Sequence, residues 1–135
     1  LEINLLKLLK EKNIKYYSCI NNIKTSDFTL NFLNTKKYNN ENDNSSVIYF
    51  DYNNYKFLFM ADASKKVEEN ILNKYYLDKV DFLKVGHHGS NTSTSEKFVS
   101  KISPKYSVIS VGKNNRYGHP KIEVLNSLKS SNIYR

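Results

Sequence analysis

The sequence is poor in the residues that usually build metal cages and covalent cross-links. Its 135 residues include one cysteine, Cys19, which excludes an internal disulfide and a zinc site made of cysteines. Histidine occurs only at His87, His88 and His119. Any metal ion bound by this chain must therefore be held by histidine and carboxylate.

Long apolar runs are also missing. No stretch approaches the roughly 20 apolar residues that a membrane-spanning helix needs. The first nine residues include Glu2 and Lys7, which do not belong in the apolar segment of a signal peptide. The composition therefore predicts neither a membrane helix nor a signal peptide within this chain.

Acidic residues are outnumbered by basic ones. Lysine and arginine total 21 against 13 aspartate and glutamate residues, which gives a formal charge of +8. Clustered lysine and arginine would favour a polyanionic partner, because they release counterions from nucleic acid. The basic residues are nearly all lysines scattered through a sequence rich in Asn, Ile and Tyr, so compositional bias and solubility are the simpler explanation. Charge alone leaves a nucleic-acid partner open.

Hydrophobic periodicity predicts strands followed by an alternation of helices and strands. Asn53 and Asn54 tolerate positive φ and predict a two-residue hairpin turn, Ser95 is suited to cap a helix, and Pro120 is suited to a first helical turn. The expected strands are 14–19, 28–33, 47–52, 55–60, 82–85 and 106–111, and the expected helices are 1–10, 64–75, 96–102 and 121–128. The Asn-rich residues 34–46 are expected to form a surface loop. This order predicts a sheet covered by helices.

A carboxylate and the histidines follow three successive apolar strands. Asp62 ends the first, His87 and His88 follow the second in a glycine-bounded loop, and His119 lies in the loop after the third. Sites collect at strand ends in layered structures, and these side chains suit zinc, manganese or iron, with Asp62 able to bridge two ions. Each residue also has a simpler interpretation: Asp62 as a helix cap, His88 as a structural histidine and His119 as a turn residue.

A set of short motifs occurs in a fixed order along the chain. They are NSSV at 44–47, LFMAD at 58–62, Glu68, DFLKVGHHGSNTS at 81–93, PKY at 104–106, VISVG at 108–112 and NRYGHP at 115–120. From about Phe28 to Arg135 the chain resembles the metallo-β-lactamase-fold domain of the competence protein ComEC and its soluble hydrolase relatives. The GHHGS and YGHP motifs, in this order after a strand-terminal Asp, carry most of the resemblance.

The chain departs from this family in two places. Ala61 stands where the family usually has the Gly of Thr-Gly-Asp, and Asp62 is retained as a ligand on the expectation that residue 61 needs no positive φ. The family's principal metal motif, His-x-(His or Asp)-x-Asp-His, precedes the aligned region and is absent from this sequence. The resemblance therefore implies an α+β fold, an αββα sandwich of which this chain supplies mainly the second half. Residues 1–135 are expected to be a partial hydrolase domain, truncated at both ends.

The resemblance implies a metal-dependent hydrolase in which Asp62, His87 and His88 act in catalysis. Its implied metal ligands are Asp62, His87 and His119, which would hold zinc or manganese, with two ions in the complete domain. A metal lowers the pKa of water to generate the nucleophile, and a second cation polarises the phosphoryl oxygen. How His87 and His88 divide metal or phosphate contact and general acid catalysis stays open. The implied substrate contacts are His88, Ser90, Asn91, Thr92, Asn115, Arg116 and Tyr117.

Three functions are compatible with these features. The leading hypothesis is a nuclease-like phosphodiesterase of competence DNA uptake, acting on single-stranded DNA, with the rest of the hydrolase domain upstream and a membrane channel in the full-length protein. The second is a metallo-hydrolase of another ester, of phosphorylcholine or lactone type. The third is a non-catalytic nucleic-acid-binding remnant, whose binding would fall steeply with salt.

Overall fold

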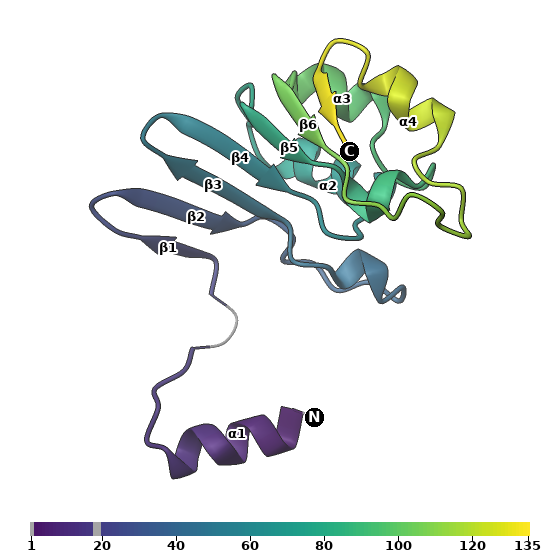
Figure 1. The fold of residues 1–135 in the computed structure, drawn as a ribbon. Coiled ribbons are helices and arrows are strands. Elements are labelled where there is room, and N and C mark those ends of the chain that lie inside the picture. Colours follow the sequence, from purple (N-terminus) through teal and green to yellow (C-terminus); the bar gives the residue numbers. More distant parts are fainter. Residues whose placement is uncertain (1, 18–19) are drawn as a thin grey trace.

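The structure is a computed structural model and describes residues 2–17 and 20–135. Its helices are α1 (Glu2–Glu11), α2 (Lys65–Lys74), α3 (Glu96–Ile102) and α4 (Ile122–Ser127), and two short 3-10 turns span Asn42–Asn44 and Gly86–Gly89. Its strands are β1 (Asn22–Lys24), β2 (Phe28–Phe32), β3 (Ile48–Tyr52), β4 (Tyr55–Phe59), β5 (Phe82–Lys84), β6 (Tyr106–Val108) and β7 (Asn132–Tyr134). All seven strands form one sheet in chain order (Figure 1).

The sheet changes from antiparallel to parallel at β4. Strands β1 to β4 form an antiparallel meander, whereas β4 to β7 pair in parallel. Parallel neighbours need a crossover connection, which α2, α3 and α4 supply in turn. The carboxyl ends of β4, β5 and β6 therefore lie at one edge of the sheet, where the loops that follow them meet.

The hairpin between β3 and β4 forms as predicted. Asn53 and Asn54 have φ of 48° and 65°, and Tyr52 pairs with Tyr55 across the turn. Two successive positive φ values match the right-handed twist of the flanking strands, and Asn accepts them at low cost. The hairpin sets the register of β4, and so determines which of its side chains face the helices.

The helices α2, α3 and α4 pack on one face of the sheet. Leu58, Leu83 and Ser107 occupy matching register positions of β4, β5 and β6 and are buried on that face. The helices contribute the buried residues Val67, Ile71, Phe98, Val99, Ile102 and Val124 to the same core, and Leu128, directly after α4, joins them. Each large apolar side chain removed from water contributes about 1.5–3 kcal/mol, so this layer is the main source of stability.

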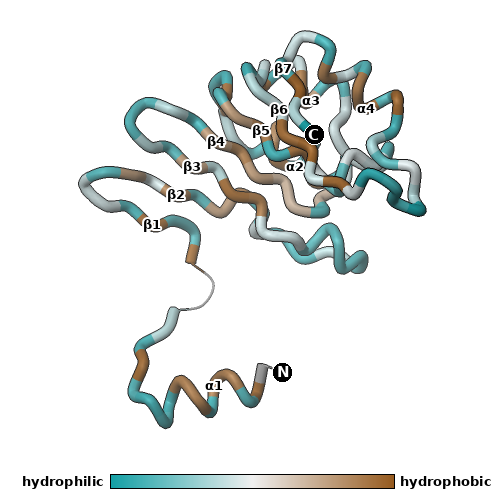
Figure 2. Tube along the Cα trace, in the orientation of Figure 1, coloured by the Kyte–Doolittle hydropathy of each residue, from teal (hydrophilic) through white to brown (hydrophobic). Residues whose placement is uncertain are grey.

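The other face of the sheet carries a ladder of aromatic rings. Phe50, Phe57, Phe82, Tyr106 and Tyr134 follow one another across β3 to β7, with neighbouring ring centroids 4.8–6.2 Å apart. The part of the chain that the structure describes places no helix on this face (Figure 1), and apolar residues run along the central strands (Figure 2). The expected fold class is confirmed: this unit is one sheet and its helical layer, as in a metallo-β-lactamase-type sandwich.

Several sequence-based boundaries are wrong. Residues 14–17 form no strand, whereas β1 was not predicted; residues 18–19, with the single cysteine, lie outside the described residues. Strand β6 ends at Val108 rather than at residue 111. Helix α4 begins at Ile122, two residues after Pro120, because the Lys121 amide donates to the carbonyl of Gly89 (2.9 Å) and stays outside the helix.

The Asn-rich segment 34–46 is a loop, but it is not wholly at the surface. Tyr38 and Asp43 are buried against the rest of the molecule. Helix α1 forms as predicted and lies apart from the sheet (Figure 1), with Ile3, Leu5 and Leu8 exposed. Within residues 2–17 and 20–135, no helix has the length and apolar character needed to cross a bilayer.

Candidate functional site

The two adjacent histidines lie in the turn Gly86–Gly89, here called the histidine turn, which is tied to both neighbouring loops. The amide of His87 donates to the carbonyl of Ala61 (2.8 Å), in the loop that carries Asp62. The carbonyl of Gly89 accepts from Lys121, beside the loop that carries His119. Because the three parallel strands end at one edge, these hydrogen bonds bring together residues far apart in the sequence.

The histidine turn has an unusual backbone. His87 has φ 45° and ψ 42°, His88 has φ 54° and ψ 24°, and Gly89 has φ 81°. Left-handed conformation costs a residue with a side chain about 1–2 kcal/mol, so two histidines in succession persist only where the surroundings impose them. Strain of this kind concentrates at functional sites.

The imidazole of His88 faces the carboxylate of Asp62. Its Nδ1 lies 2.7 Å from the carbonyl oxygen of Ser110, and a carbonyl can only accept, so Nδ1 carries the proton. In the neutral imidazole Nε2 is then the nitrogen without a proton, and it lies 3.9 Å from Asp62 Oδ1, with the two side chains 54% and 45% exposed. This gap is too long for a hydrogen bond. Two ligand atoms about 2.0–2.2 Å from one tetrahedral zinc ion lie roughly 3.4 Å apart, so the gap would close by about 0.5 Å around a bound ion.

His87 and His119 lie beside this pair. Their rings meet edge to face with centroids 6.3 Å apart, and His87 Nδ1 is 3.2 Å from the hydroxyl of Thr92. Within residues 2–17 and 20–135, Nδ1 of His119 is buried without a hydrogen-bond partner. Burial, followed by the nearby Lys121 cation and the other two histidines, lowers the pKa of His119. A neutral imidazole with an unpaired nitrogen is the form that binds a cation.

His88 and His119 both line a hollow of about 390 Å³. Its remaining lining residues are Ser110, Val111, Gly112, Asn115 and Tyr117. Arg116 is absent from the lining, and its guanidinium instead donates to the Tyr117 hydroxyl (2.6 Å) and lies 4.9 Å from the centre of that ring.

The predicted substrate contacts divide into exposed and internal groups. Asn91 and Thr92 are exposed. Ser90 is buried, and its hydroxyl is 3.0 Å from that of Thr92. The side chain of Asn115 donates to the carbonyl of His119 (2.7 Å) and accepts from its amide (2.9 Å). Asn115 therefore holds His119 in place in addition to lining the hollow.

The loop of Asp62 corrects one expectation from the sequence. Ala61 has φ 47°, so the backbone there does adopt the left-handed conformation for which glycine is better suited. The helix-cap interpretation of Asp62 also fails, because Ser64 occupies the N-cap position of α2. The Asp62 side chain remains free to face His88.

Two residues that the sequence did not single out for chemistry hold this loop. The hydroxyl of Ser45 accepts from the amide of Asp62 (3.2 Å), and the buried carboxylate of Asp43 accepts from the amide of Ser64 (3.1 Å). Both lie in the Asn-rich loop, whose polar composition hides any functional signal. The resemblance drew attention to Ser45 as part of a motif but gave it no role.

The residues at this edge fit part of a metal site. Among the described residues, no group of three or more His, Cys, Asp or Glu side chains converges. Asp62 and His88 nevertheless have the chemistry of two ligands and lie 3.9 Å apart. The carbonyl on the far nitrogen of His88 is the usual outer partner that orients a metal-ligating histidine.

The comparison with known families agrees with the fold. Residues 24–113 match the family described as the Metallo-beta-lactamase superfamily. The chain belongs to this superfamily, whose members are generally hydrolases and usually bind divalent metals.

Proteins with competence and recombination names are similar to this chain. It is 40% identical over 93 residues to ComE operon protein 3 of Bacillus subtilis, 39% over 88 residues to Recombination protein 2 of Haemophilus influenzae, and 36% over 105 residues to Competence protein ComA of Neisseria gonorrhoeae. These alignments cover 69%, 65% and 76% of this chain but 12%, 11% and 15% of the relatives, so the chain spans about an eighth of their length. The resemblance to the metallo-β-lactamase domain of the ComEC family is confirmed.

Proposed function

We propose that this chain is the second half of a metal-dependent hydrolase domain that cleaves phosphodiester bonds of single-stranded DNA during competence DNA uptake. The observation that carries the proposal is the pairing of Asp62 with His88 at the edge where three loops meet. Nε2 of His88 faces Asp62 Oδ1 across 3.9 Å, while the Ser110 carbonyl fixes the tautomer that leaves Nε2 unprotonated. Such an arrangement is suited to a cation, because the outer carbonyl orients the imidazole toward the carboxylate.

In this proposal Asp62 and His88 are ligands of a divalent cation, zinc or manganese. His88 is preferred to His87 as the ligand, because only His88 has an outer carbonyl partner and an unprotonated nitrogen directed at the carboxylate. A bound divalent cation supplies Lewis acidity and a lowered pKa for water. His119, neutral and with a buried unpaired nitrogen, contributes a further ligand or a substrate contact.

His87 is left for proton transfer and substrate contact. Its Nδ1 lies 3.2 Å from the Thr92 hydroxyl, which holds the ring beside the ligand pair. A histidine in that position can hold a proton and deliver it to the leaving oxygen. Thr92, exposed next to it, offers its hydroxyl to a phosphate.

Two ligands do not complete a metal site, so we propose that the others come from a His/Asp motif in a segment that precedes this chain. The relatives are about eight times longer than the aligned region, which is compatible with residues 1–135 being part of a larger domain. The aromatic face of the sheet gives that segment an apolar surface to cover. If an upstream segment supplies the remaining ligands, the described residues need not bring three His, Cys, Asp or Glu side chains together, and no such group is found among them.

Single-stranded DNA is the proposed substrate because the edge combines cations with an exposed aromatic ring. Lys113, Arg116 and Lys121 lie on the loop that borders the hollow, and Tyr117 is exposed on the same loop. Basic residues attract the phosphate backbone. The Tyr117 ring stacks with His119 (centroids 5.7 Å apart) and has Arg116 over it, and its exposed surface extends this layer toward a base. The names of the relatives, which refer to competence and recombination, support a nucleic-acid substrate.

The test compares single-residue variants of the full-length protein that contains this chain. Asp62→Asn and His88→Gln are each expected to reduce bound zinc or manganese by elemental analysis and to lower cleavage of single-stranded DNA by at least about 100-fold. Asp27→Asn, the same chemical change in the exposed turn before β2, serves as the control and is expected to retain both. Unchanged metal content in the Asp62 and His88 variants would contradict the proposal.

The wild-type protein separates this proposal from its competitors. Metal-dependent cleavage of a phosphorylcholine ester or a lactone, with no cleavage of DNA, would show a hydrolase of another ester. A wild-type protein without stoichiometric metal that binds DNA with steep salt dependence would be a non-catalytic binding remnant.

A further inference from the structure

Glu68 is the most deeply buried acidic residue in the described part of the chain. Its side chain is 1% exposed, and it lies on α2 among residues of the hydrophobic core such as Val67 and Ile71. No salt bridge of residues 2–17 and 20–135 involves Glu68. A buried carboxylate is costly unless hydrogen bonds satisfy its oxygens, so what those oxygens contact indicates why the acid is there.

Both oxygens of Glu68 accept backbone amides of one short segment. One accepts from the amide of Thr94 and the other from the amide of Ser95, the latter at 2.9 Å. Thr94 has φ 59°, a left-handed conformation for a β-branched residue, which the paired hydrogen bonds impose. Helix α3 does not need Glu68 for its cap, because the Ser95 hydroxyl itself accepts from the amide of Phe98.

The segment that Glu68 holds is connected to both ends of the histidine turn. Ser93, which precedes Thr94, has a fully buried hydroxyl 2.8 Å from the carbonyl of Gly86 and 3.1 Å from that of Ser90. Gly86 and Ser90 flank His87 and His88. A displacement of Thr94 and Ser95 would therefore reach the two imidazoles through one side chain.

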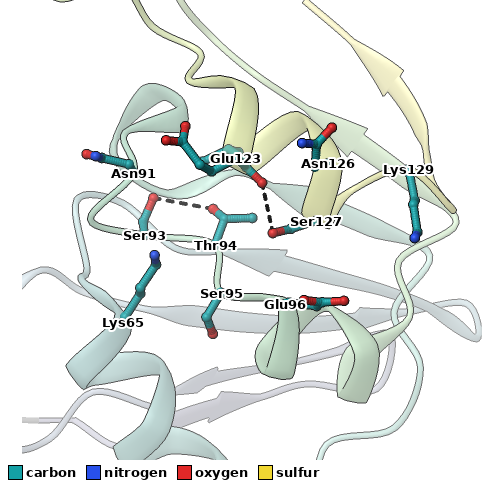
Figure 3. Close-up of a pocket in the computed structure, with 11 residues that line it drawn as sticks. Lys65, Asn91, Ser93, Thr94, Ser95, Glu96, Glu123, Asn126, Ser127 and Lys129 are labelled. Atoms are coloured by element: carbon teal, nitrogen blue, oxygen red, sulfur yellow. Dashed lines mark hydrogen bonds between the residues drawn. The ribbon is translucent and has the colours of Figure 1, made fainter.

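The other side of this segment borders a cleft, although Ser93 and Thr94 are themselves buried. Figure 3 shows Ser93, Thr94 and Ser95 lining a cleft of about 570 Å³ together with Lys65 from the start of α2 and Glu123 from α4. Within residues 2–17 and 20–135, no hydrogen bond joins Ser93, Thr94 or Ser95 to α4, whereas Glu68 accepts two from this segment. The carboxylate of Glu68 is thus the support on the side of α2.

We propose that Glu68 is a positioning residue for the histidine turn: it holds the amides of Thr94 and Ser95, and through Ser93 it sets the orientation of His87 and His88. The inference rests on the proposed metal site and extends it to a residue with no access to the metal. A purely packing role would favour an apolar residue at this core position, since replacing buried charge by apolar side chains is often neutral or stabilising. A carboxylate is needed where two adjacent amides must be held.

The test uses Glu68→Gln in the natural-length protein, with Ile71→Ala as the matched control. Gln keeps the volume of Glu but replaces one acceptor by a donor, so one amide loses its partner. Ile71 is buried one turn further along α2 and carries no polar atom on its side chain. We expect Glu68→Gln to raise hydrogen exchange at residues 87–90 and 94–95 and to weaken zinc binding by about 10–100-fold, as outer-shell changes do. Ile71→Ala is expected to lower the Tm while leaving the Kd for zinc unchanged.

Glu68→Asp provides a second variant if Glu68→Gln does not fold. Asp keeps both carboxylate oxygens as acceptors but places them one methylene further from the amides of Thr94 and Ser95. The Glu68→Asp variant is expected to bind zinc with a Kd between those of the wild type and Glu68→Gln. Zinc affinity of Glu68→Gln within twofold of Ile71→Ala, with unchanged exchange at residues 87–90, would overturn the inference. If the wild type binds neither zinc nor manganese, the proposed function fails, while the exchange of residues 87–90 still tests the role of Glu68.

Discussion

Replacing Gly89 by alanine tests whether the packing of the histidine turn against the His119 loop holds the site together. Gly89 has φ 81°, and a Cβ built on it would lie 2.6 Å from Cβ and 3.0 Å from Cα of Pro120. Contacts below 3.0 Å do not persist, and Pro120 is a rigid ring that cannot turn aside. The substitution must therefore displace Pro120 and, with it, the neighbouring His119.

The expected cost has two parts. Alanine in the left-handed conformation costs about 1–2 kcal/mol, and overpacking against the ring adds about 1–3 kcal/mol. The lower entropy of alanine in the unfolded chain returns about 0.4–1 kcal/mol. The net loss of unfolding free energy is about 1–4.6 kcal/mol, which for a unit of this size lowers the Tm by roughly 4–16 °C.

The assay is thermal and urea unfolding of Gly89→Ala beside Gly112→Ala. Gly112 is a matched control in the loop that borders the same hollow, because a Cβ there would meet nothing within 4 Å. Its alanine variant is expected to stay within about 0.5 kcal/mol of the wild type. Equal stabilities of the two variants would refute the claimed contact between Gly89 and Pro120.

Two further predictions concern neighbouring residues. Ala61→Gly is expected to raise the free energy of unfolding by about 0.5–1 kcal/mol, because glycine relieves the strain of φ 47° at an exposed position, and a fall in Tm would contradict that assignment. In metal-free buffer, unfolding free energy is expected to decline as the pH falls below about 6.5, since the folded state lowers the pKa of His119 and the unfolded state binds the proton more readily. Urea unfolding from pH 7.5 to 5.5 should show a smaller decline in His119→Gln, and an identical decline in both proteins would exclude His119 as its source.

Short sequence patterns predicted those parts of the fold that depend only on neighbouring residues. The positive φ of Asn53 and Asn54, the cap of Ser95 and the apolar strands before Asp62 and His87 depend on neighbouring residues, and all are present in the structure. The expected strand over residues 14–17 failed, because alternation of apolar residues does not create a strand without a partner to pair with. Strand β1 forms instead opposite β2, where Ile23 pairs with Leu30.

Contacts distant in the sequence determined the geometry of the site. Which nitrogen of His88 faces Asp62 depends on the Ser110 carbonyl, 22 residues away, and the support of Thr94 depends on Glu68, 26 residues away. Glu68 did carry a signal, as an acid on the buried face of an amphipathic helix beside Val67 and Ile71. Asp43 carried none, since an acid in an Asn-rich loop is ordinary.

By itself, the sequence determined that histidine and carboxylate follow successive strands, that cysteine plays no part in a metal cage, and that the motifs belong to the metallo-β-lactamase superfamily. Only the tertiary structure decided that Asp62 and His88 face one another, that Ala61 takes a left-handed backbone, and that Ser90 and Asn115 are engaged within their loops. The physical reason is that residue type and order state which chemical groups are available. Their orientation arises from hydrogen bonds and packing between loops that meet only after the parallel strands have paired.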